Sequence, residues 1–207
     1  MSRQRSPITR YILNADSYVG RVFRPGIRAL GGSKDPPYMY IITIGVIVYL
    51  SMIVEAGRAR RNEQAQLARG GHEPDGDVYA IMRVAYPAVF LTMLVEGALR
   101  GAPPANVMAA GAALFVAAKA LKWWAIVSLG SAWTFRIIVM PGVSLVAAGP
   151  YRYLRHPNYV AVIGELASVA LLTGARVAGP IATIVFGALV ARRVSVENRA
   201  LDAILRR

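Results

Sequence analysis

Apolar stretches with few or no charged side chains alternate along the chain with basic, turn-rich segments. Residues 38–54 carry no charged side chain and end at Glu55, which is just long enough to cross a hydrocarbon core of about 30 Å at about 1.5 Å per residue. Four further apolar stretches follow, over residues 84–99, 107–129, 159–175 and 177–190. We therefore predict an all-α integral membrane bundle of about five transmembrane helices.

Glycine and proline residues indicate where the connections between these spans lie. Gly101 and the two prolines that follow it form a short connection between the second span and the third. The connection between the last two spans contains Gly174 and Gly179 and is so short that these two spans form a helical hairpin. Because the last helix of this C-terminal hairpin packs on the one before it, its polar continuation can bring Glu197 and Asn198 back towards the segment that precedes residue 159.

The N-terminal part has a different pattern. Apolar residues between positions 8 and 22 recur at helical spacing, while arginines fall on the other faces, so residues 1–37 are predicted to form an amphipathic N-terminal segment lying on the membrane surface.

An odd number of spans puts the first loop, residues 130–158 and the C-terminus on one side. Most loop arginines fall there, so that side is predicted to be cytoplasmic; the N-terminal arginines fall on the other side, against this rule.

Composition narrows the possible functions. A content of 56% hydrophobic residues and a net charge of +13 favour a membrane protein with basic loops over a nucleic-acid binder. The chain has no cysteine, which excludes disulfides, thiolate metal sites and thiol nucleophiles, and its two histidines leave little for a metal site.

The densest group of polar side chains lies in residues 149–159, which read GPYRYLRHPNY. Arginines can hold carboxylates, tyrosine rings can stack on a purine or flank a sulfonium cation, and histidine can exchange a proton near neutral pH. The alternative is an interfacial belt of aromatic and basic residues.

Several charged residues fall inside or next to the apolar stretches. Glu165 is costly there, so it either binds a ligand or pairs with Lys119, Lys122 or an arginine. The two lysines are otherwise expected to reach the interface. Glu96 and Arg100 are expected to form an ion pair, and Glu55 a solvated pair with Arg58 beside Asn62. For Arg193 and Glu197 an ordinary surface pair is one possibility, and the return of Glu197 to the segment before residue 159 is the other.

The run GPYRYLRHPNY, the intramembrane Glu165, the hairpin and the later run RRVSVENRAL resemble the isoprenylcysteine carboxyl methyltransferase family of integral membrane methyltransferases. The resemblance covers about residues 133–201. It implies that S-adenosylmethionine is the methyl donor, with S-adenosylhomocysteine as its product, and that a lipid acceptor arrives from the bilayer. Residues 38–207 would then form a transmembrane methyltransferase domain, with the cofactor-binding part at about 130–207.

The resemblance assigns roles to individual residues. The cofactor-binding set it implies is Tyr151, Arg152, Leu154, Arg155, His156, Pro157, Tyr159, Glu165, Glu197 and Asn198, and the catalytic set is His156, Glu197 and Arg155. The family has a second glutamate where this chain has Asn198, which puts in doubt any role that needs two carboxylates.

The stretch from residue 128 to 159 looks closest to a bacterial branch that methylates phenolic lipids such as alkylresorcinols and alkylpyrones. Prenylcysteine carboxyl methylation and phospholipid N-methylation remain alternatives. A membrane scaffold that binds anionic lipids is the non-enzymatic alternative. Neither the acceptor nor the oligomeric state follows from spacing or composition.

Overall fold

The computed structural model describes residues 38–140 and 146–205, with side chains described up to residue 200. The amphipathic segment predicted over residues 1–37 lies outside this part. The described part is all-α, as predicted, and its one β-bridge is an isolated pair between His72 and Val139. Five α-helices follow in the order α2 (Met39–Leu67), α3 (Tyr79–Arg100), α4 (Ala105–Leu129), α5 (Pro157–Thr173) and α6 (Ala178–Leu205), with short 3₁₀ turns η1 (Gly130–Ala132) and η2 (Gly149–Arg152).

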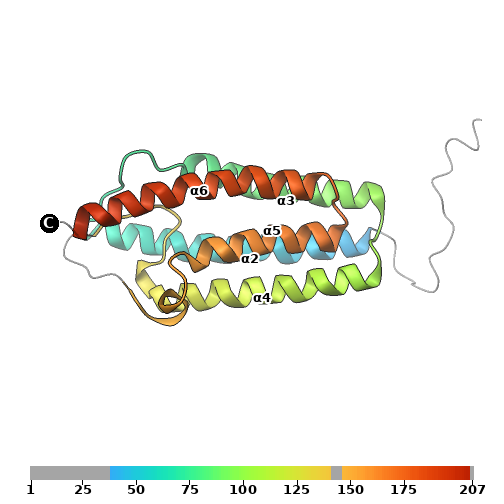
Figure 1. The fold of residues 1–207 in the computed structure, drawn as a ribbon, viewed down its shortest axis with the longest axis horizontal. Coiled ribbons are helices and arrows are strands. Elements are labelled where there is room, and N and C mark those ends of the chain that lie inside the picture. The colour runs from blue at the N-terminus through green and yellow to red at the C-terminus, as the bar shows by residue number, and fades with distance from the viewer. Residues whose placement is uncertain (1–37, 141–145, 206–207) are drawn as a thin grey trace, which may run out of the picture. The chain divides into compact units, whose positions relative to one another are not determined.

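The five helices lie side by side and are connected at alternating ends of the bundle (Figure 1). The connections from α2 to α3 and from α4 to α5 meet at one end, together with the end of α6. We call this the loop end. The short connections from α3 to α4 and from α5 to α6 lie at the opposite end, so the arrangement matches the alternation expected for five spans.

Four helical segments are long and apolar enough to cross a membrane, namely Met39–Leu67, Tyr79–Arg100, Ala105–Ala132 and Ala178–Ala200. The remaining helix, α5, is apolar but shorter, with 17 residues. Pro157 occupies its first turn, where a missing N–H costs nothing. Gly174 ends it in the left-handed conformation at φ 68°.

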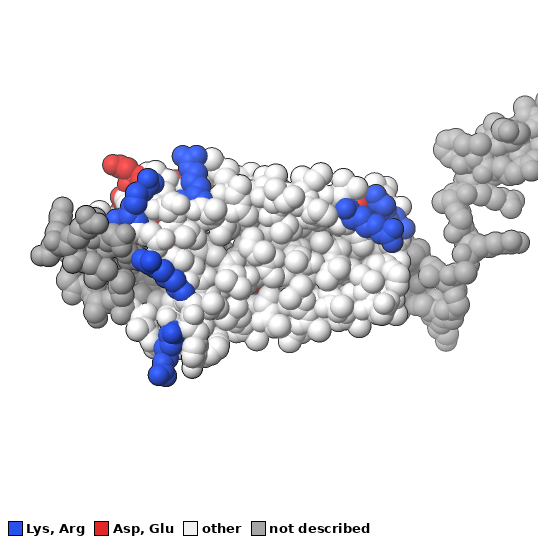
Figure 2. All heavy atoms as spheres, in the orientation of Figure 1, with Lys and Arg blue, Asp and Glu red and all other residues white. Residues whose placement is uncertain are grey.

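The outer surface of the bundle is apolar between two charged ends. Leu99, Val116 and Ile184 are 83%, 67% and 73% exposed, which is unfavourable in water and ordinary in contact with lipid. On the face drawn in Figure 2, lysine and arginine side chains gather near the two ends, and the broad middle is almost free of charge. The chain is accordingly a multi-pass integral membrane protein.

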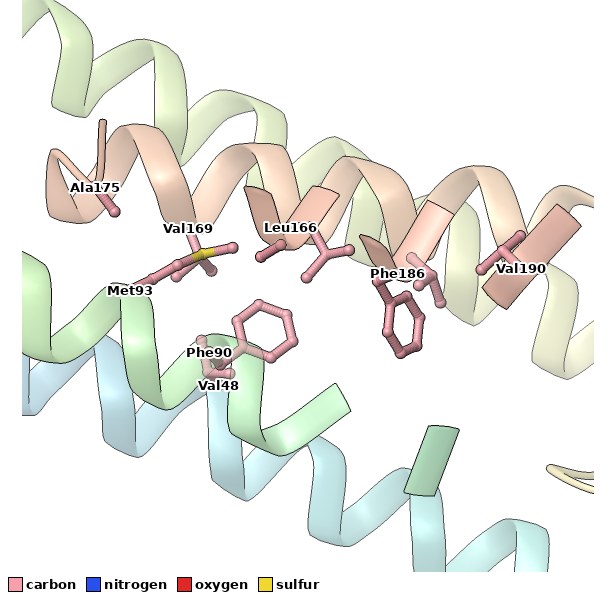
Figure 3. Close-up of a cluster of buried hydrophobic side chains, with 10 residues drawn as sticks. Val48, Phe90, Met93, Leu166, Val169, Ala175, Phe186 and Val190 are labelled. Atoms are coloured by element: carbon pink, nitrogen blue, oxygen red, sulfur yellow. The ribbon is translucent and has the colours of Figure 1, made fainter. Parts of the chain in front are cut away.

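The core lies where α2, α3, α5 and α6 face one another. Phe90 and Met93 of α3 point towards Leu166 and Val169 of α5, and Phe186 of α6 closes the group (Figure 3). Helix α4 packs against the other side of α5, where Gly164 comes close to Ala118. Small residues at such a contact let two membrane helices approach closely.

Helix α2 corrects one prediction, because one face of the segment from Glu55 onward is buried. Glu55 and Glu63 are buried in the helix, which continues to Leu67. Asn62 Nδ2 donates to the carbonyl oxygens of Gly130 and Trp133, at 3.0 Å and 2.7 Å. One face of the polar half of α2 is therefore buried against the segment that follows α4, and the solvated pair predicted for Glu55 and Arg58 is wrong, because Glu55 pairs with lysines inside the bundle.

Candidate functional site

Four of the predicted site residues meet at the loop end, where the start of α5 lies against the last turns of α6. The hydroxyl of Tyr159 donates to Glu197 Oε2 at 2.8 Å. His156 Nε2 lies 3.1 Å from Asn198 Oδ1, and His156 Nδ1 lies 3.7 Å from Glu197 Oε2. The helical hairpin thus joins side chains that are about 40 positions apart in the sequence into one polar group.

The contacts of His156 suit one tautomer of its ring. With its hydrogen on Nε2, the imidazole donates to Asn198 Oδ1. In a neutral imidazole the lone pair is then on Nδ1, on the side of Glu197. His156 can therefore accept a proton at Nδ1 and stabilise it beside a carboxylate.

Arg193 holds this polar group in place from α6. Its side chain is almost completely buried, and its Nε donates to the Tyr159 hydroxyl at 2.8 Å. Its guanidinium also donates to Asp77 Oδ1 at 3.0 Å and to the Phe135 carbonyl oxygen. Of the two possibilities for this region, the surface pair between Arg193 and Glu197 is not formed, because Asp77 of the α2–α3 connection and the Phe135 carbonyl after α4 bind the guanidinium instead.

Of the other residues in the segment 151–159, some are buried and some are exposed. Pro157 is buried, and Tyr151 is half-buried. Burial, followed by the negative charge of Glu197, raises the pKa of the Tyr151 hydroxyl, which therefore stays protonated at neutral pH. Arg152, Leu154 and Arg155 are exposed at the loop end.

Glu165 does not join this group, because it lies almost two helical turns further along α5. Its Oε1 is 3.1 Å from Lys119 Nζ and 3.2 Å from Lys122 Nζ. Of the two alternatives for this acid, pairing with the lysines is thus observed, and its role in cofactor binding stays a prediction. The expectation that the lysines reach the interface is wrong: Lys122 is 2% exposed, because glutamates on α2 and α5 neutralise it inside the bundle.

A cavity of about 600 Å³ lies next to the polar group, on the side of α2 and α3. Tyr159, Asn158 and Arg193 form part of its wall at the loop end. Asn158 Oδ1 is buried and has no hydrogen-bond partner among the described residues. Such an orphaned acceptor is rare in a folded protein and marks a place for a ligand group that can donate.

Sequence reasoning missed three residues that shape this region: Asp77, Asn158 and Arg193. Asn158 and Arg193 lie within the two runs that carry the family resemblance, so their position was a usable signal. Asp77 gave no such signal, because its contact with Arg193 spans 116 residues.

Comparison with known protein families gives a match over this part of the chain. The pattern of the isoprenylcysteine carboxyl methyltransferase (ICMT) family matches residues 111–203, which include both the 149–159 run and the end of α6. No solved structure matches the chain significantly.

Two bacterial relatives extend the similarity over most of the chain. A Bacillus subtilis (strain 168) protein named "Uncharacterized protein YpbQ" is 31% identical over 164 residues, which cover 79% of this chain and 97% of that protein. A Haemophilus influenzae protein named "Uncharacterized protein" is 23% identical over 143 residues, covering 69% of this chain and 83% of the relative. With the family match spanning α4 to α6 and the site they enclose, the chain belongs to the isoprenylcysteine carboxyl methyltransferase family.

Proposed function

We propose that the protein transfers a methyl group from S-adenosylmethionine to a phenolic lipid held in the membrane. The observation that carries this proposal is the meeting of His156 and Tyr159 with Glu197 and Asn198 at one end of an apolar bundle, beside a cavity. A polar, proton-accepting group at the edge of a lipid-facing structure suits a reaction between a water-soluble donor and a membrane-bound acceptor.

The side chains present fit the methyl donor. The orphaned Asn158 Oδ1 offers an acceptor for an amino or hydroxyl hydrogen, and Glu197 offers a carboxylate for an ammonium group or ribose hydroxyls. Arg152 is exposed at the same end and can bind a carboxylate. When bound, the donor supplies a methyl group activated by its attachment to a sulfonium centre.

The residues of the chain would then orient the acceptor and remove its proton. A phenol resembles tyrosine, with a pKa of about 10, so its hydroxyl needs a base at neutral pH. His156 Nδ1 can take that proton, and Glu197, 3.7 Å away, stabilises the resulting charge. Holding both reactants in line can contribute roughly 7–11 kcal/mol to lowering the barrier. Arg155 keeps its predicted catalytic role as part of this proposal.

The need for a base distinguishes the candidate acceptors. A prenylcysteine carboxylate is already ionised and would want a cationic partner, whereas a phenol benefits from His156 and Glu197. Asn198 stands where the family has a second acid. Its neutral amide contacts the Nε2 side of His156 without adding a negative charge.

The test is methyl transfer by the purified protein from a labelled donor. The acceptor panel consists of an alkylresorcinol, a prenylcysteine and phosphatidylethanolamine. We expect label on the alkylresorcinol, with turnover reduced at least about a hundredfold in His156→Ala, as is usual when a general base is removed. His72→Ala is the matched control, since His72 is exposed in the α2–α3 connection. Label only on another acceptor would overturn the phenolic assignment, and unchanged turnover in His156→Ala would overturn the site.

A further inference from the structure

Two glutamates and two lysines form a closed network of ion pairs inside the bundle. Lys119 Nζ lies 2.8 Å from Glu55 Oε1, and Lys122 Nζ lies 2.6 Å from Glu55 Oε2. Both lysines also contact Glu165, as described above, and the Tyr86 hydroxyl donates to Glu165 Oε2. Three helices contribute the charges and α3 contributes the tyrosine, so the network joins α2, α3, α4 and α5 with a formal charge of zero.

Stability alone does not account for such a network. Glu55, Lys122 and Glu165 are each 1–2% exposed, and the desolvation of buried ions offsets most of their mutual attraction. Well-packed apolar residues of similar volume often stabilise a protein as well or better. Ionisable groups within membrane-spanning helices are rare and mark functional sites by default.

Three members of the network face the cavity. Glu55, Tyr86 and Lys122 line it, at a deeper level than Tyr159 and Arg193. We call these three side chains the polar floor. The walls beside them are apolar or aromatic, and the ring of Phe186 lies 5.0 Å from the ring of Tyr86, centroid to centroid. The cavity therefore combines a polar floor with walls that suit a flat ring and an alkyl chain.

Exposed residues of α2 and α3 form part of the cavity wall. Ile53 of α2 lines it and is 65% exposed, and Arg83 on α3, which also lines it, is exposed. Because the outer face of α2 is apolar at this level, an amphiphile can reach the polar floor from the membrane without crossing water.

The hydrogen bonds that the polar floor already makes determine which chemical group of a ligand it can bind. Lys122 Nζ has three donor hydrogens and lies near three carboxylate oxygens, so it has no donor to spare. Each oxygen of Glu55 contacts one lysine and can accept a further hydrogen bond. The Tyr86 hydroxyl donates to Glu165 and can still accept. The free capacity of the polar floor is therefore for accepting hydrogen bonds.

Charge restricts the ligand further. A carboxylate ligand would bring no hydrogen to donate and would meet Glu55, while an ammonium ligand would meet the Lys122 ammonium at the same place. An uncharged hydroxyl matches both the neutral network and its spare acceptors.

We propose that Glu55, Tyr86 and Lys122 form the recognition site for the head of the acceptor, and that this head is an uncharged, hydroxyl-bearing ring. The inference rests on the proposed function in treating the cavity as the acceptor site. It adds the residues that select the acceptor, which lie away from the His156 group.

Equilibrium binding to the full-length protein in detergent tests this inference without any methyl donor. The probes are hexylresorcinol, hexylbenzene, ionised hexylbenzoic acid and protonated hexylbenzylamine, which share a ring and a chain and differ in the head. We expect hexylresorcinol to bind at least about tenfold more tightly than each of the others, the effect of one or more buried hydrogen bonds. Equal affinity for all four probes, or a preference for either charged probe, overturns the proposal.

Two variants locate the preference at the polar floor. Glu55→Met/Lys119→Met removes the spare acceptor and keeps the charge balanced, and it should reduce the preference for hexylresorcinol over hexylbenzene at least about fivefold. The matched control is Glu96→Met/Arg100→Met, which removes an ion pair of 2.6 Å at the opposite end of α3. A preference that survives in the first variant contradicts the assignment.

A milder substitution covers the case in which the double variant does not fold. Tyr86→Phe removes one hydroxyl from the polar floor and should weaken hexylresorcinol binding about threefold or more. Tyr40→Phe, whose hydroxyl bonds to Gly97 outside the cavity, should leave it unchanged. Equal effects of Tyr86→Phe and Tyr40→Phe overturn the proposal. If methyl transfer succeeds while these binding results fail, the inference is wrong and the proposed function stands.

Discussion

Tyr159 connects the two halves of the candidate site through a single hydroxyl group. It donates to Glu197 and accepts from Arg193, each at 2.8 Å. Arg193 is in turn held by Asp77 and a backbone carbonyl. The carboxylate beside His156 is therefore positioned by residues from three separate parts of the chain.

Removing that hydroxyl should disturb the donor site and leave the fold intact. Tyr159→Phe leaves a buried arginine with one partner fewer, so we expect about 1–3 kcal/mol lower stability. The affinity for S-adenosylhomocysteine should fall about tenfold, measured by calorimetric titration. Tyr153→Phe is the control, because Tyr153 lies in the same segment 151–159 and is 76% exposed. Equal losses in the two variants would contradict the positioning role.

The buried charge network gives a second prediction at this scale. Lys122→Met leaves two acids to share one lysine inside the bundle, so we expect a loss of about 3–5 kcal/mol in the free energy of unfolding. Lys122→Met/Glu165→Met should lose less than the single variant, because the charge is balanced again. Thermal unfolding in detergent measures both, and a double variant less stable than Lys122→Met would refute the coupling.

Only part of the site was predictable from residue types. Residue types indicated His156 and Tyr159, which lie in a run rich in polar side chains, whereas the family resemblance supplied the role of Glu197. The network of Glu55 with Lys119 and Lys122 was missed, because a lysine inside an apolar stretch has the same local pattern whether it reaches the interface or meets a buried acid from another helix.

At the scale of elements, a close helix contact at a glycine sets the distance between α3 and α5. Gly97 of α3 packs directly against the end of α5, where an added Cβ would lie 2.6 Å from the Thr173 backbone oxygen. Backbone cannot move aside as a flexible side chain can, so this contact fixes the distance between α3 and α5.

Gly97→Ala should therefore separate the two helices. We expect a destabilisation of about 1–3 kcal/mol, typical of overpacking at a tight contact, together with weaker binding of hexylresorcinol. Gly57→Ala on α2 is the control, because nothing lies within 4 Å of the added Cβ. Unfolding curves that show the same change in both variants would rule out this packing role.

The helices themselves were largely predictable, because long apolar runs bounded by glycine and proline leave few alternatives in a membrane. The predicted spans fall within or close to α2 to α6. The buried face of the polar half of α2 was not predictable, since it is formed against the carbonyl groups of residues 130–133 and the backbone N–H groups of Phe135 and Arg136. The periodicity of a local stretch of sequence cannot predict hydrogen-bond partners that come from distant segments.

At the scale of the whole molecule, the alternation of connections places the candidate site at one membrane face. The site lies at the loop end together with the α2–α3 connection, and the Ala102 connection lies at the other end (Figure 1). The bias of arginines towards the loop end predicts that this end faces the cytoplasm.

Because the chain has no cysteine, introduced cysteines can test this orientation directly. In intact bacterial cells, a membrane-impermeant thiol reagent should label Ala102→Cys at once and Asp75→Cys only after permeabilisation. Both positions are exposed. The opposite labelling pattern would place the candidate site on the outer face, away from a cytoplasmic methyl donor.

The central claim is that the group around His156 and Glu197 binds the methyl donor. Calorimetric titration of the purified protein with S-adenosylhomocysteine tests this claim most directly, with His156→Ala and Glu197→Ala compared against His72→Ala. The account predicts saturable binding to the wild-type protein and to His72→Ala, and binding weakened at least about tenfold in the other two variants. Absence of binding to the wild-type protein, or equal affinity in all four proteins, would contradict it.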